Sequence, residues 1–149
     1  MRKNCGYHIR GMSIMHQKFS ETNSTFSVGS GKFRVNMSIS RVDGGIVAVV
    51  GGGERSHIGA AAIAVPYTKV KNQPLDSSSS VITLPGHKDD VLARAISEKL
   101  AKSLNQVVVV VAGVHVDNAS KSDIELLVSN CMECTEKAIC HLKKVETEI

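Results

Sequence analysis

Five consecutive valines, Val107 to Val111, constrain the fold more than any other stretch of the sequence. β-Branched side chains favour extended backbone, and an uninterrupted apolar run leaves no side chain to face water. We therefore expect Val107 to Val111 to form a central strand that is buried on both faces. The rest of the chain must then supply a sheet around this strand.

Four segments before the valine run have strand patterns. Residues 33–40 alternate apolar and polar side chains, which is the period of a strand with one solvated face. Asp43-Gly44-Gly45 has the composition of a tight turn and is followed by the apolar segment Ile46 to Val50, so the two segments predict a β-hairpin. The small-residue run Ala60 to Val65 and the segment Ser79 to Leu84 predict a third and a fourth strand. Together the four segments predict an antiparallel meander.

Two further segments have the period of amphipathic helices. In the first, apolar residues recur at steps of three and four behind Asp89 and Asp90, which favour a helix N-terminus. The second begins with Ser120-Lys121-Ser122-Asp123, which has the spacing of a capping box. The apolar stripe of the first helix is Leu92, Ala95, Ile96, Leu100 and Leu104; that of the second is Ile124, Leu127, Val128, Cys131, Cys134, Ala138, Leu142 and Val145.

The order of these elements, β-β-β-β-α-β-α, indicates an α+β fold. We expect a single-domain two-layer α/β sandwich, in which a mainly antiparallel sheet carries both helices on one face. The length of 149 residues fits one domain. Residues 1–32 have no sustained period and are rich in small polar residues. We expect them to form a loosely ordered N-terminal leader or an added edge segment, before a single domain over residues 33–149.

The composition argues against several classes of function. The chain is 42% apolar and 21% charged, as is usual for soluble globular proteins. A net charge of only +4, with two Tyr, three Phe and no Trp, leaves little for nucleic-acid bases to stack on. No apolar run approaches the length of a membrane helix, and the N-terminus has no continuous apolar signal core. We expect a cytoplasmic protein that binds neither nucleic acid nor membranes.

The four cysteines are Cys5, Cys131, Cys134 and Cys140. A cytoplasmic location predicts reduced thiols and no disulfide framework. Cys131 and Cys134 lie inside a continuous helical pattern on its apolar face, where cysteine packs as a small hydrophobic residue, and no second ligand pair lies nearby. We therefore expect no metal at the cysteines. Cys140 falls off the stripe and should react first with thiol reagents.

Three segments place glycines, a histidine and polar residues where strand-like runs end. They are Gly51-Gly52-Gly53-Glu54-Arg55-Ser56-His57-Ile58-Gly59, Pro85-Gly86-His87-Lys88-Asp89-Asp90 and Gly113-Val114-His115-Val116-Asp117-Asn118. Taken alone, each is also typical of an ordinary connection, with its histidine hydrogen-bonded at a sheet edge. Three similar junctions in one small domain predict one shared site.

The residue types in these segments support two kinds of site. If the site is a polar binding pocket, the glycine backbone would approach the ligand, while Arg55 and Lys88 would neutralise a phosphate. As a metal centre, the three histidines would bind a divalent ion that activates water, with Asp89 or Asp117 as base or orienting partner. No nucleophile has an adjacent base in the sequence. The candidate binding residues are Gly51, Gly52, Gly53, Arg55, His57, Gly59, His87, Lys88, Asp89, His115, Asp117 and Asn118.

The same segments carry a family resemblance. Gly52-Gly53-x-x-x-His57-Ile58-Gly59, His87-Lys88-Asp89 and Ala112-Gly113-Val114-His115-Val116-Asp117-Asn118-Ala119 resemble the signature segments of the LpdD-type proteins. These are small prenylated-flavin chaperones associated with UbiD-type decarboxylases. The similarity spans about Val42 to Asn130. The resemblance implies a protein that carries prenylated flavin mononucleotide (FMN), or FMN itself, without a turnover reaction of its own.

We therefore expect a binding protein for prenylated FMN that supports maturation of a UbiD-type decarboxylase. In this interpretation His57, His87 and His115 hydrogen-bond the flavin ring or ribityl chain. The sequence leaves open whether the chain is an enzyme, and the resemblance favours an accessory protein. The alternative is a metal-dependent hydrolase or lyase that uses the same three histidines. A homo-oligomer is favoured by the valine run, the long C-terminal helix and the small residues Ala60 to Ala64. The sequence does not predict its symmetry.

Overall fold

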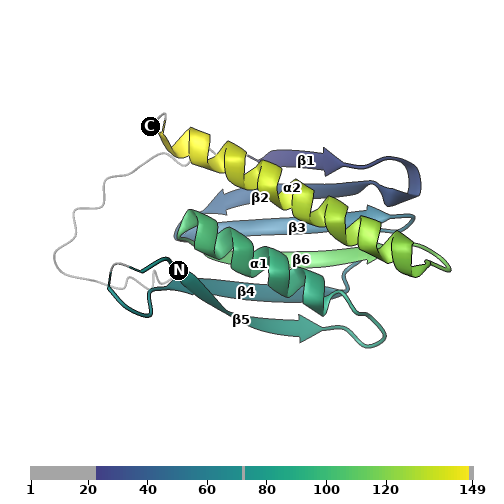
Figure 1. Cartoon of the computed structure of the whole chain (residues 1–149), viewed down its shortest axis with the longest axis horizontal. Coiled ribbons are helices and arrows are strands. Elements are labelled where there is room, and N and C mark those ends of the chain that lie inside the picture. Colours follow the sequence, from purple (N-terminus) through teal and green to yellow (C-terminus); the bar gives the residue numbers. More distant parts are fainter. Residues whose placement is uncertain (1–22, 72, 148–149) are drawn as a thin grey trace, which may run out of the picture.

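The computed structural model describes residues 23–71 and 73–147. In this part of the chain a six-stranded mixed sheet carries two helices on one face (Figure 1). The elements are β1 (Ser24–Val28), the 3-10 turn η1 (Gly31–Phe33), β2 (Val35–Val42), β3 (Gly45–Gly53), β4 (Ala60–Tyr67), β5 (Asp76–Thr83), α1 (Asp90–Leu104), β6 (Val107–His115) and α2 (Lys121–Thr147). The predicted α+β class, the order of elements from β2 onward and the mainly antiparallel sheet are confirmed.

The segment before residue 33 contains an edge strand. β1 pairs antiparallel with β2, and Val28 at its end is buried. Residues 24–28 thus form the added edge segment that was one of the two expectations, because their backbone pairs with that of β2. Residues 1–22, which include Cys5, lie outside the part of the chain that the structure describes.

The sheet order is β1-β2-β3-β6-β4-β5, so β6 lies between β3 and β4. β6 is parallel to β3 and antiparallel to β4. The predicted continuous meander is therefore wrong, because the strand that follows α1 enters the middle of the sheet and separates β3 from β4. The β2–β3 hairpin itself has the predicted Asp43-Gly44 turn, where Gly44 adopts a φ of +84°. Glycine adopts this conformation without steric cost.

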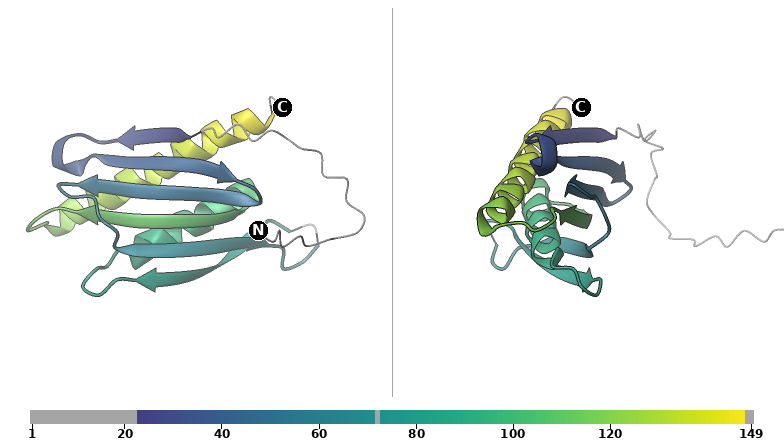
Figure 2. Two further views of the ribbon diagram at one scale, coloured as in Figure 1. Left: turned by 180° about the vertical axis from the view of Figure 1, so that it is seen from behind. Right: turned by 90° about the vertical axis from the view of Figure 1, so that its right-hand side faces the viewer.

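The valine run is central, as predicted, but only one of its faces is covered. Val108 and Val110 are fully buried, whereas Val107, Val109 and Val111 remain partly exposed. Both helices lie on the same side of the sheet, and no described element covers the other side (Figure 2). The expectation of burial on both faces is therefore wrong for a single copy of the chain.

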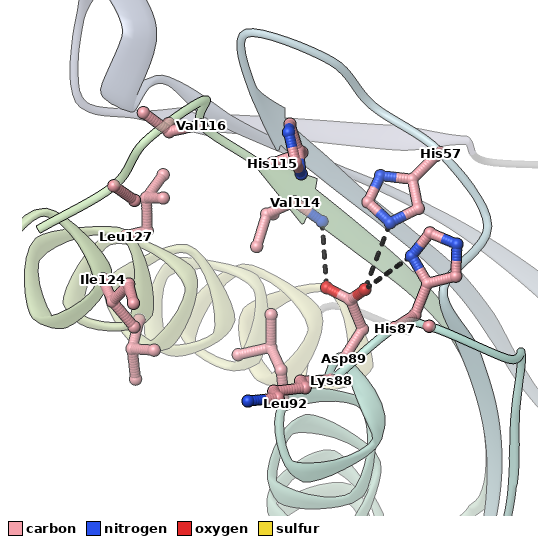
Figure 3. Close-up of a pocket in the computed structure, with 13 residues that line it drawn as sticks. His57, His87, Lys88, Asp89, Leu92, Val114, His115, Val116, Ile124 and Leu127 are labelled. Atoms are coloured by element: carbon pink, nitrogen blue, oxygen red, sulfur yellow. Dashed lines mark hydrogen bonds and ion pairs between the residues drawn. The ribbon is translucent and has the colours of Figure 1, made fainter. Parts of the chain in front are cut away.

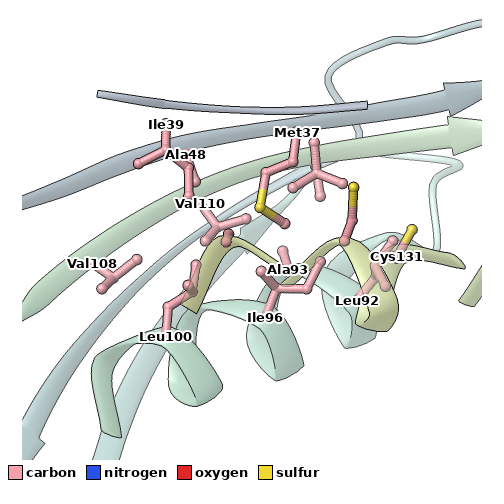
Figure 4. Packing of buried hydrophobic residues seen from close by; sticks show 14 of the residues in the cluster. Met37, Ile39, Ala48, Leu92, Ala93, Ile96, Leu100, Val108, Val110 and Cys131 are labelled. Carbon is pink, nitrogen blue, oxygen red and sulfur yellow. The ribbon is translucent and has the colours of Figure 1, made fainter. Parts of the chain in front are cut away.

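The core lies between the sheet and the two helices. Met37 and Ile39 of β2 and Ile96 and Leu100 of α1 belong to this core, and all four are fully buried (Figure 4). α1 packs over β4, β5 and β6, while α2 packs mainly over β1 and β2. The alanines of β4 that face α1 are completely buried, which lets the helix approach closely. The predicted close packing of the Ala60 to Val65 run thus holds for the face that meets α1, whereas Ile63 and Val65 on the other face are exposed.

α2 begins with the predicted capping box and continues along the predicted stripe. The Ser120 N–H donates to Asp123 Oδ2 at 3.0 Å, and the Asp123 N–H donates to Ser120 Oγ at 3.2 Å. The stripe is buried at Leu127, Cys131, Cys134, Ala138 and Leu142, but Ile124 and Val128 are exposed. The first turns of α2 extend beyond the buried core, so these two side chains line an open pocket.

The cysteines of α2 divide as the helical pattern predicts. Cys131 and Cys134 are buried, and Cys140 is exposed. Burial raises the pKa of the Cys131 thiol to about 12 and also raises the pKa of Cys134. Both residues therefore behave as small hydrophobic groups at neutral pH.

Candidate functional site

The three predicted junctions meet at one end of the sheet. His57 lies in the loop between β3 and β4, His87 lies in the loop before α1, and His115 ends β6. The ring centroids of His57 and His87 are 4.5 Å apart, and those of His57 and His115 are 6.2 Å apart. Segments that are distant in the sequence thus supply three neighbouring imidazoles.

Asp89 is the buried carboxylate of this site. Its Oδ1 accepts the Val114 N–H at 3.1 Å, while its Oδ2 lies 3.1 Å from His57 Nε2 and 3.9 Å from His87 Nδ1 (Figure 3). Asp89 is also the N-cap residue of α1, yet its side chain makes no capping hydrogen bond. An N-cap aspartate ordinarily bonds the first free helix N–H groups. Here the carboxylate instead joins β6 to two histidines, and we call His57, His87 and Asp89 the inner cluster.

Glycines make room for the inner cluster. A Cβ at Gly59 would overlap the Asp89 carboxylate, and a Cβ at Gly113 would overlap the His57 carbonyl. Gly53 has a φ of +79° and lies against the His115 backbone. These positions need glycine because protein atoms, not a ligand, occupy the adjacent space.

The glycine run is not the ligand-facing loop that the sequence suggested. β3 continues through Gly53, so the connecting loop covers only residues 54–59. A Cβ at Gly51 would meet Ser56, and one at Gly52 would meet the backbone of Arg34 and Val35. Within the described chain, neither glycine lines the pocket described below. Sequence reasoning identified residues that need glycine but could not tell packing against the protein from approach to a ligand.

A second set of charged side chains lies at the solvent-exposed rim. Arg55 Nη2 is 2.6 Å from Asp117 Oδ1, and His115 Nε2 is 2.8 Å from the same oxygen. The hydrogen bond from His115, together with the Arg55 charge, lowers the pKa of the Asp117 carboxyl below its usual value. We call Arg55, His115 and Asp117 the outer cluster. Asn118 follows it in an exposed turn with a φ of +50°.

The inner cluster forms one wall of a pocket of about 350 Å³, a volume within the range of small-molecule sites. Lys88 and His115 also line this pocket. The opposite wall is apolar and comes from α1, the end of β6 and the first turns of α2: Leu92, Val114, Val116, Ala119, Ile124, Leu127 and Val128. The sequence does not predict this wall, because the apolar stripe of α2 does not show which of its residues extend beyond the end of the sheet. A smaller hollow bounded by Arg55, His57, His87 and His115 adjoins the imidazoles.

The two predicted phosphate-binding cations occupy different environments. The Arg55 guanidinium is paired with Asp117, so an anion would have to compete with that carboxylate. Lys88 lines the pocket and forms no ion pair with any described residue. Lys88 is therefore the cation more available to a ligand.

The residues with metal-binding geometry differ from the three histidines that the sequence suggested. One ligand atom each from His57, His87 and Asp89 lies within 4.8 Å of the others. His115 Nε2 instead contacts Asp117 and Arg55. The β6 end directs His115 toward the rim, while the α1 N-terminus brings Asp89 between the other two histidines. Sequence reasoning had assigned Asp89 only a secondary role in the metal centre.

Residues 29–143 match the model of the prenylated flavin chaperone LpdD-like domain. No curated protein matches the chain. Among solved structures, one match is a chain from a structure described as a novel chaperone complex for yeast 20S proteasome assembly. That match has a TM-score of 0.43 and 7% sequence identity, and it covers 76% of this chain and 98% of the other. No helix in residues 23–71 or 73–147 is long and apolar enough to span a membrane.

Proposed function

The chain belongs to the prenylated flavin chaperone LpdD-like family, and on this basis we propose that it binds prenylated FMN as a carried ligand. The observation that carries the proposal is the pocket, whose lining combines an apolar wall with three histidines and a lysine. A flavin ring system has flat apolar faces and a polar edge, and the prenyl-derived ring adds hydrocarbon. Apolar surface with a few convergent polar groups is the usual composition of such sites.

In this proposal the two walls bind different parts of the flavin. The ring lies against Ile124 and Val128, which are exposed in the described structure. His57, His87 and His115 hydrogen-bond the polar edge or the ribityl chain. Lys88 binds the phosphate near the N-terminus of α1, where the helix dipole also favours negative charge. Arg55 adds to phosphate binding only when it is released from Asp117.

We further propose that delivery, and not catalysis, is the role of the bound flavin. His87 and Lys88 are exposed, so the polar side of the pocket opens to solvent. An open pocket lets a ligand leave without unfolding of the domain. The acceptor that we propose is a UbiD-type decarboxylase in the cytoplasm, whose maturation requires the prenylated flavin. A pull-down of that decarboxylase in the presence and absence of flavin tests this step.

Titration of the full chain with FMN and with prenylated FMN tests the carrier proposal. Flavin fluorescence and calorimetry should show saturable binding of one ligand per chain. Ile124→Asp should weaken binding because it places a charge in the apolar wall, whereas Leu126→Asp, which changes an exposed residue outside the pocket, should not. Absence of saturable binding for both flavins would contradict the proposal.

The open face of the sheet supports a homo-oligomer. On this face the three middle strands, β3, β6 and β4, place only alanine, valine and isoleucine between residues 46–50, 107–111 and 61–65. Val49 is 52% exposed and Ile63 is 44% exposed. Serines of β2 and β5 flank this apolar strip on either side. An uncharged centre with a polar rim is typical of protein interfaces.

We propose that a second copy of the chain covers this face. The strip has no charge to match, so the same surface of another copy complements it in a symmetric dimer. Such pairing would also give the valine strand the second buried face that its sequence predicts. Light scattering should give the mass of a dimer, and Val49→Lys should give a monomer. Val91→Lys, on the exposed side of α1, is the control that should leave the mass unchanged. A monomeric native chain would contradict the proposal.

A further inference from the structure

We propose that the inner cluster, His57, His87 and Asp89, binds one divalent transition-metal ion. The chemistry of the side chains supports this assignment. Two imidazole nitrogens and one carboxylate oxygen suit Zn²⁺, Co²⁺, Ni²⁺ or Mn²⁺, whereas Ca²⁺ and Mg²⁺ prefer oxygen ligands. The proposal concerns a site in the protein itself and does not rest on flavin binding.

Two of the three distances between ligand atoms are close to those that an ion requires. A tetrahedral ion with bonds of about 2.1 Å separates its ligand atoms by about 3.4 Å. His57 Nε2 and Asp89 Oδ2 are 3.1 Å apart, and His87 Nδ1 and Asp89 Oδ2 are 3.9 Å apart. All three ligand atoms lie within 4.8 Å of one another, so the His87 side chain, which is 38% exposed, must move inward to complete the set.

Two ligands are already oriented by backbone groups. Asp89 Oδ1 accepts the Val114 N–H, which fixes the carboxylate and leaves Oδ2 directed at the histidines (Figure 3). His57 Nδ1 lies 3.4 Å from the Arg55 carbonyl oxygen, which can only accept a hydrogen bond. With the proton of the neutral imidazole on Nδ1, the lone pair of Nε2 is the one that can bind an ion. Outer hydrogen bonds of this kind are the usual support of metal-binding histidines and carboxylates.

Two features of the backbone keep the inner cluster in place. The Asp89 side chain makes no capping hydrogen bond at the N-terminus of α1 and is directed at the histidines instead. Gly59 and Gly113 leave the space that Asp89 and the His57 backbone occupy. A buried carboxylate held between two imidazoles by special backbone positions is better explained by a ligand function than by helix capping.

Three protein ligands leave at least one coordination position open. This number is typical of ions that also bind water or an oxygen of a ligand. His57 and His87 line both the main pocket and the smaller hollow, so an ion between them is accessible from the ligand side. The open position would accept an anionic oxygen such as that of a phosphate.

Titration of chelator-treated, tag-free full chain with Co²⁺ tests the proposal. Visible absorption should saturate at one Co²⁺ per chain, and Zn²⁺ should displace the Co²⁺. His57→Ala, His87→Ala and Asp89→Asn should each weaken binding by at least about 100-fold, because even outer partners of metal ligands contribute 10–100-fold. The matched control is His141→Ala, since His141 is an exposed histidine of α2 far from the site. Its affinity should stay within about twofold of that of the native chain, the effect expected of a distant surface change.

His87→Ala is the decisive variant, because an exposed side chain can be removed without loss of folding, which circular dichroism verifies. The chain has six histidines, so Co²⁺ binding that persists unchanged in His87→Ala would place the ion elsewhere and overturn the proposal. Loss of binding in His115→Ala as large as that in His57→Ala would overturn the assigned ligand set. Absence of saturable binding would overturn the site altogether. A negative flavin titration would leave all of these outcomes unaffected.

Discussion

The inner and outer clusters contain similar residues in different environments. Each combines an aspartate with histidine, and His57 and His115 are neighbours. The Asp89 side chain is 9% exposed and bonded to the β6 backbone, whereas that of Asp117 is 59% exposed and bonded to Arg55 and His115. Exposed ion pairs contribute little because water screens them and side-chain entropy opposes them. The same pairing inside the protein has a fixed geometry and a large cost of disruption.

This difference separates two roles at one end of the sheet. In the inner cluster the Asp89 carboxylate is fixed by its hydrogen bond to the β6 backbone, so only the exposed His87 side chain has to move when an ion binds. The outer cluster can exchange its partners, because its side chains lie in solvent. Residue type alone does not assign these roles, and the following variants test whether burial does.

Gly59→Ala should have the largest effect. The added Cβ would overlap the Asp89 carboxylate, so either the loop or the carboxylate must move. We expect a loss of about 2–4 kcal/mol in the free energy of unfolding, measured by urea denaturation. Asp89→Ala in the same chain should recover part of this loss, since it removes the overlapping atoms. A Gly59→Ala chain as stable as the native one would show that the inner cluster is not tightly packed.

Comparison of Asp89→Asn with Asp117→Asn should give the next largest difference. Asp89→Asn weakens the bond to His57 in a buried site, and we expect a cost of about 1–3 kcal/mol in the free energy of unfolding. Asp117→Asn should change it far less, because the group is exposed. Equal costs for the two substitutions would remove the distinction between the clusters.

The contribution of Asp117 to the free energy of unfolding should depend on pH, and the direction of its pKa shift gives the sign. The folded pKa of Asp117 lies below the unfolded value of 3.8, so its contribution is present above that pH. The contribution is lost as the pH falls through the lowered folded pKa. Native and Asp117→Asn chains should therefore converge in stability in acid, which urea denaturation at a series of pH values measures.

The sequence predicted the parts of the fold that depend on local pattern. The alternation in β2, the Asp43-Gly44 turn and the capping box at Ser120 each rest on short-range physics, and the structure contains all three. The position of β6 between β3 and β4 depends on contacts between distant segments. Antiparallel pairing between successive strands is the common outcome, and here tertiary packing of α1 overrides it.

The candidate site was only partly predictable for the same reason. Repetition of glycine and histidine at three junctions indicated that His57, His87 and His115 lie together, and they do. The sequence could not show that Asp89 is buried between two of them, because an aspartate before a helix is ordinarily a cap. Nor could it separate Lys88 from Arg55, since the partner of Arg55 lies 62 residues later in the chain.

Cys131 is a buried thiol of α2 whose pKa depends in part on Asp89 of the inner cluster. Burial, with smaller contributions from the neighbouring Cys134 and then from the Asp89 charge, raises the Cys131 pKa from 9.0 to about 12. The folded state then retains a proton that the unfolded state loses, so stability should fall as the pH rises from about 9 toward 12. Cys131→Ala should cost about 1–2 kcal/mol at neutral pH and should flatten this alkaline decline. Urea denaturation at a series of pH values from 7 to about 10.5 measures both the cost at neutral pH and the start of the alkaline decline.

Thiol labelling compares the exposed and the buried cysteines of α2. Cys140 is exposed and should react first, while Cys131 and Cys134 should stay protected in the native chain. Flavin binding should be unchanged in the Cys134→Ala chain, which alters no pocket residue. Rapid labelling of all three thiols only after chelator treatment would instead indicate that the cysteines bind metal.

A modest effect on ligand affinity is expected of the two cations beside the pocket, and this prediction rests on the proposed flavin function. Lys88→Ala should weaken FMN binding by about three- to tenfold and reduce its dependence on salt, because an ammonium group near a phosphate is screened by added ions. Arg55→Ala should have a smaller effect, since binding through Arg55 requires that it first separate from Asp117. Lys121→Ala, which removes a highly exposed lysine outside the pocket, is the control for net charge. Calorimetric titration at low and high salt measures all three variants. A larger loss for Arg55→Ala than for Lys88→Ala would place the phosphate at the outer cluster and reverse the proposed roles of the two cations.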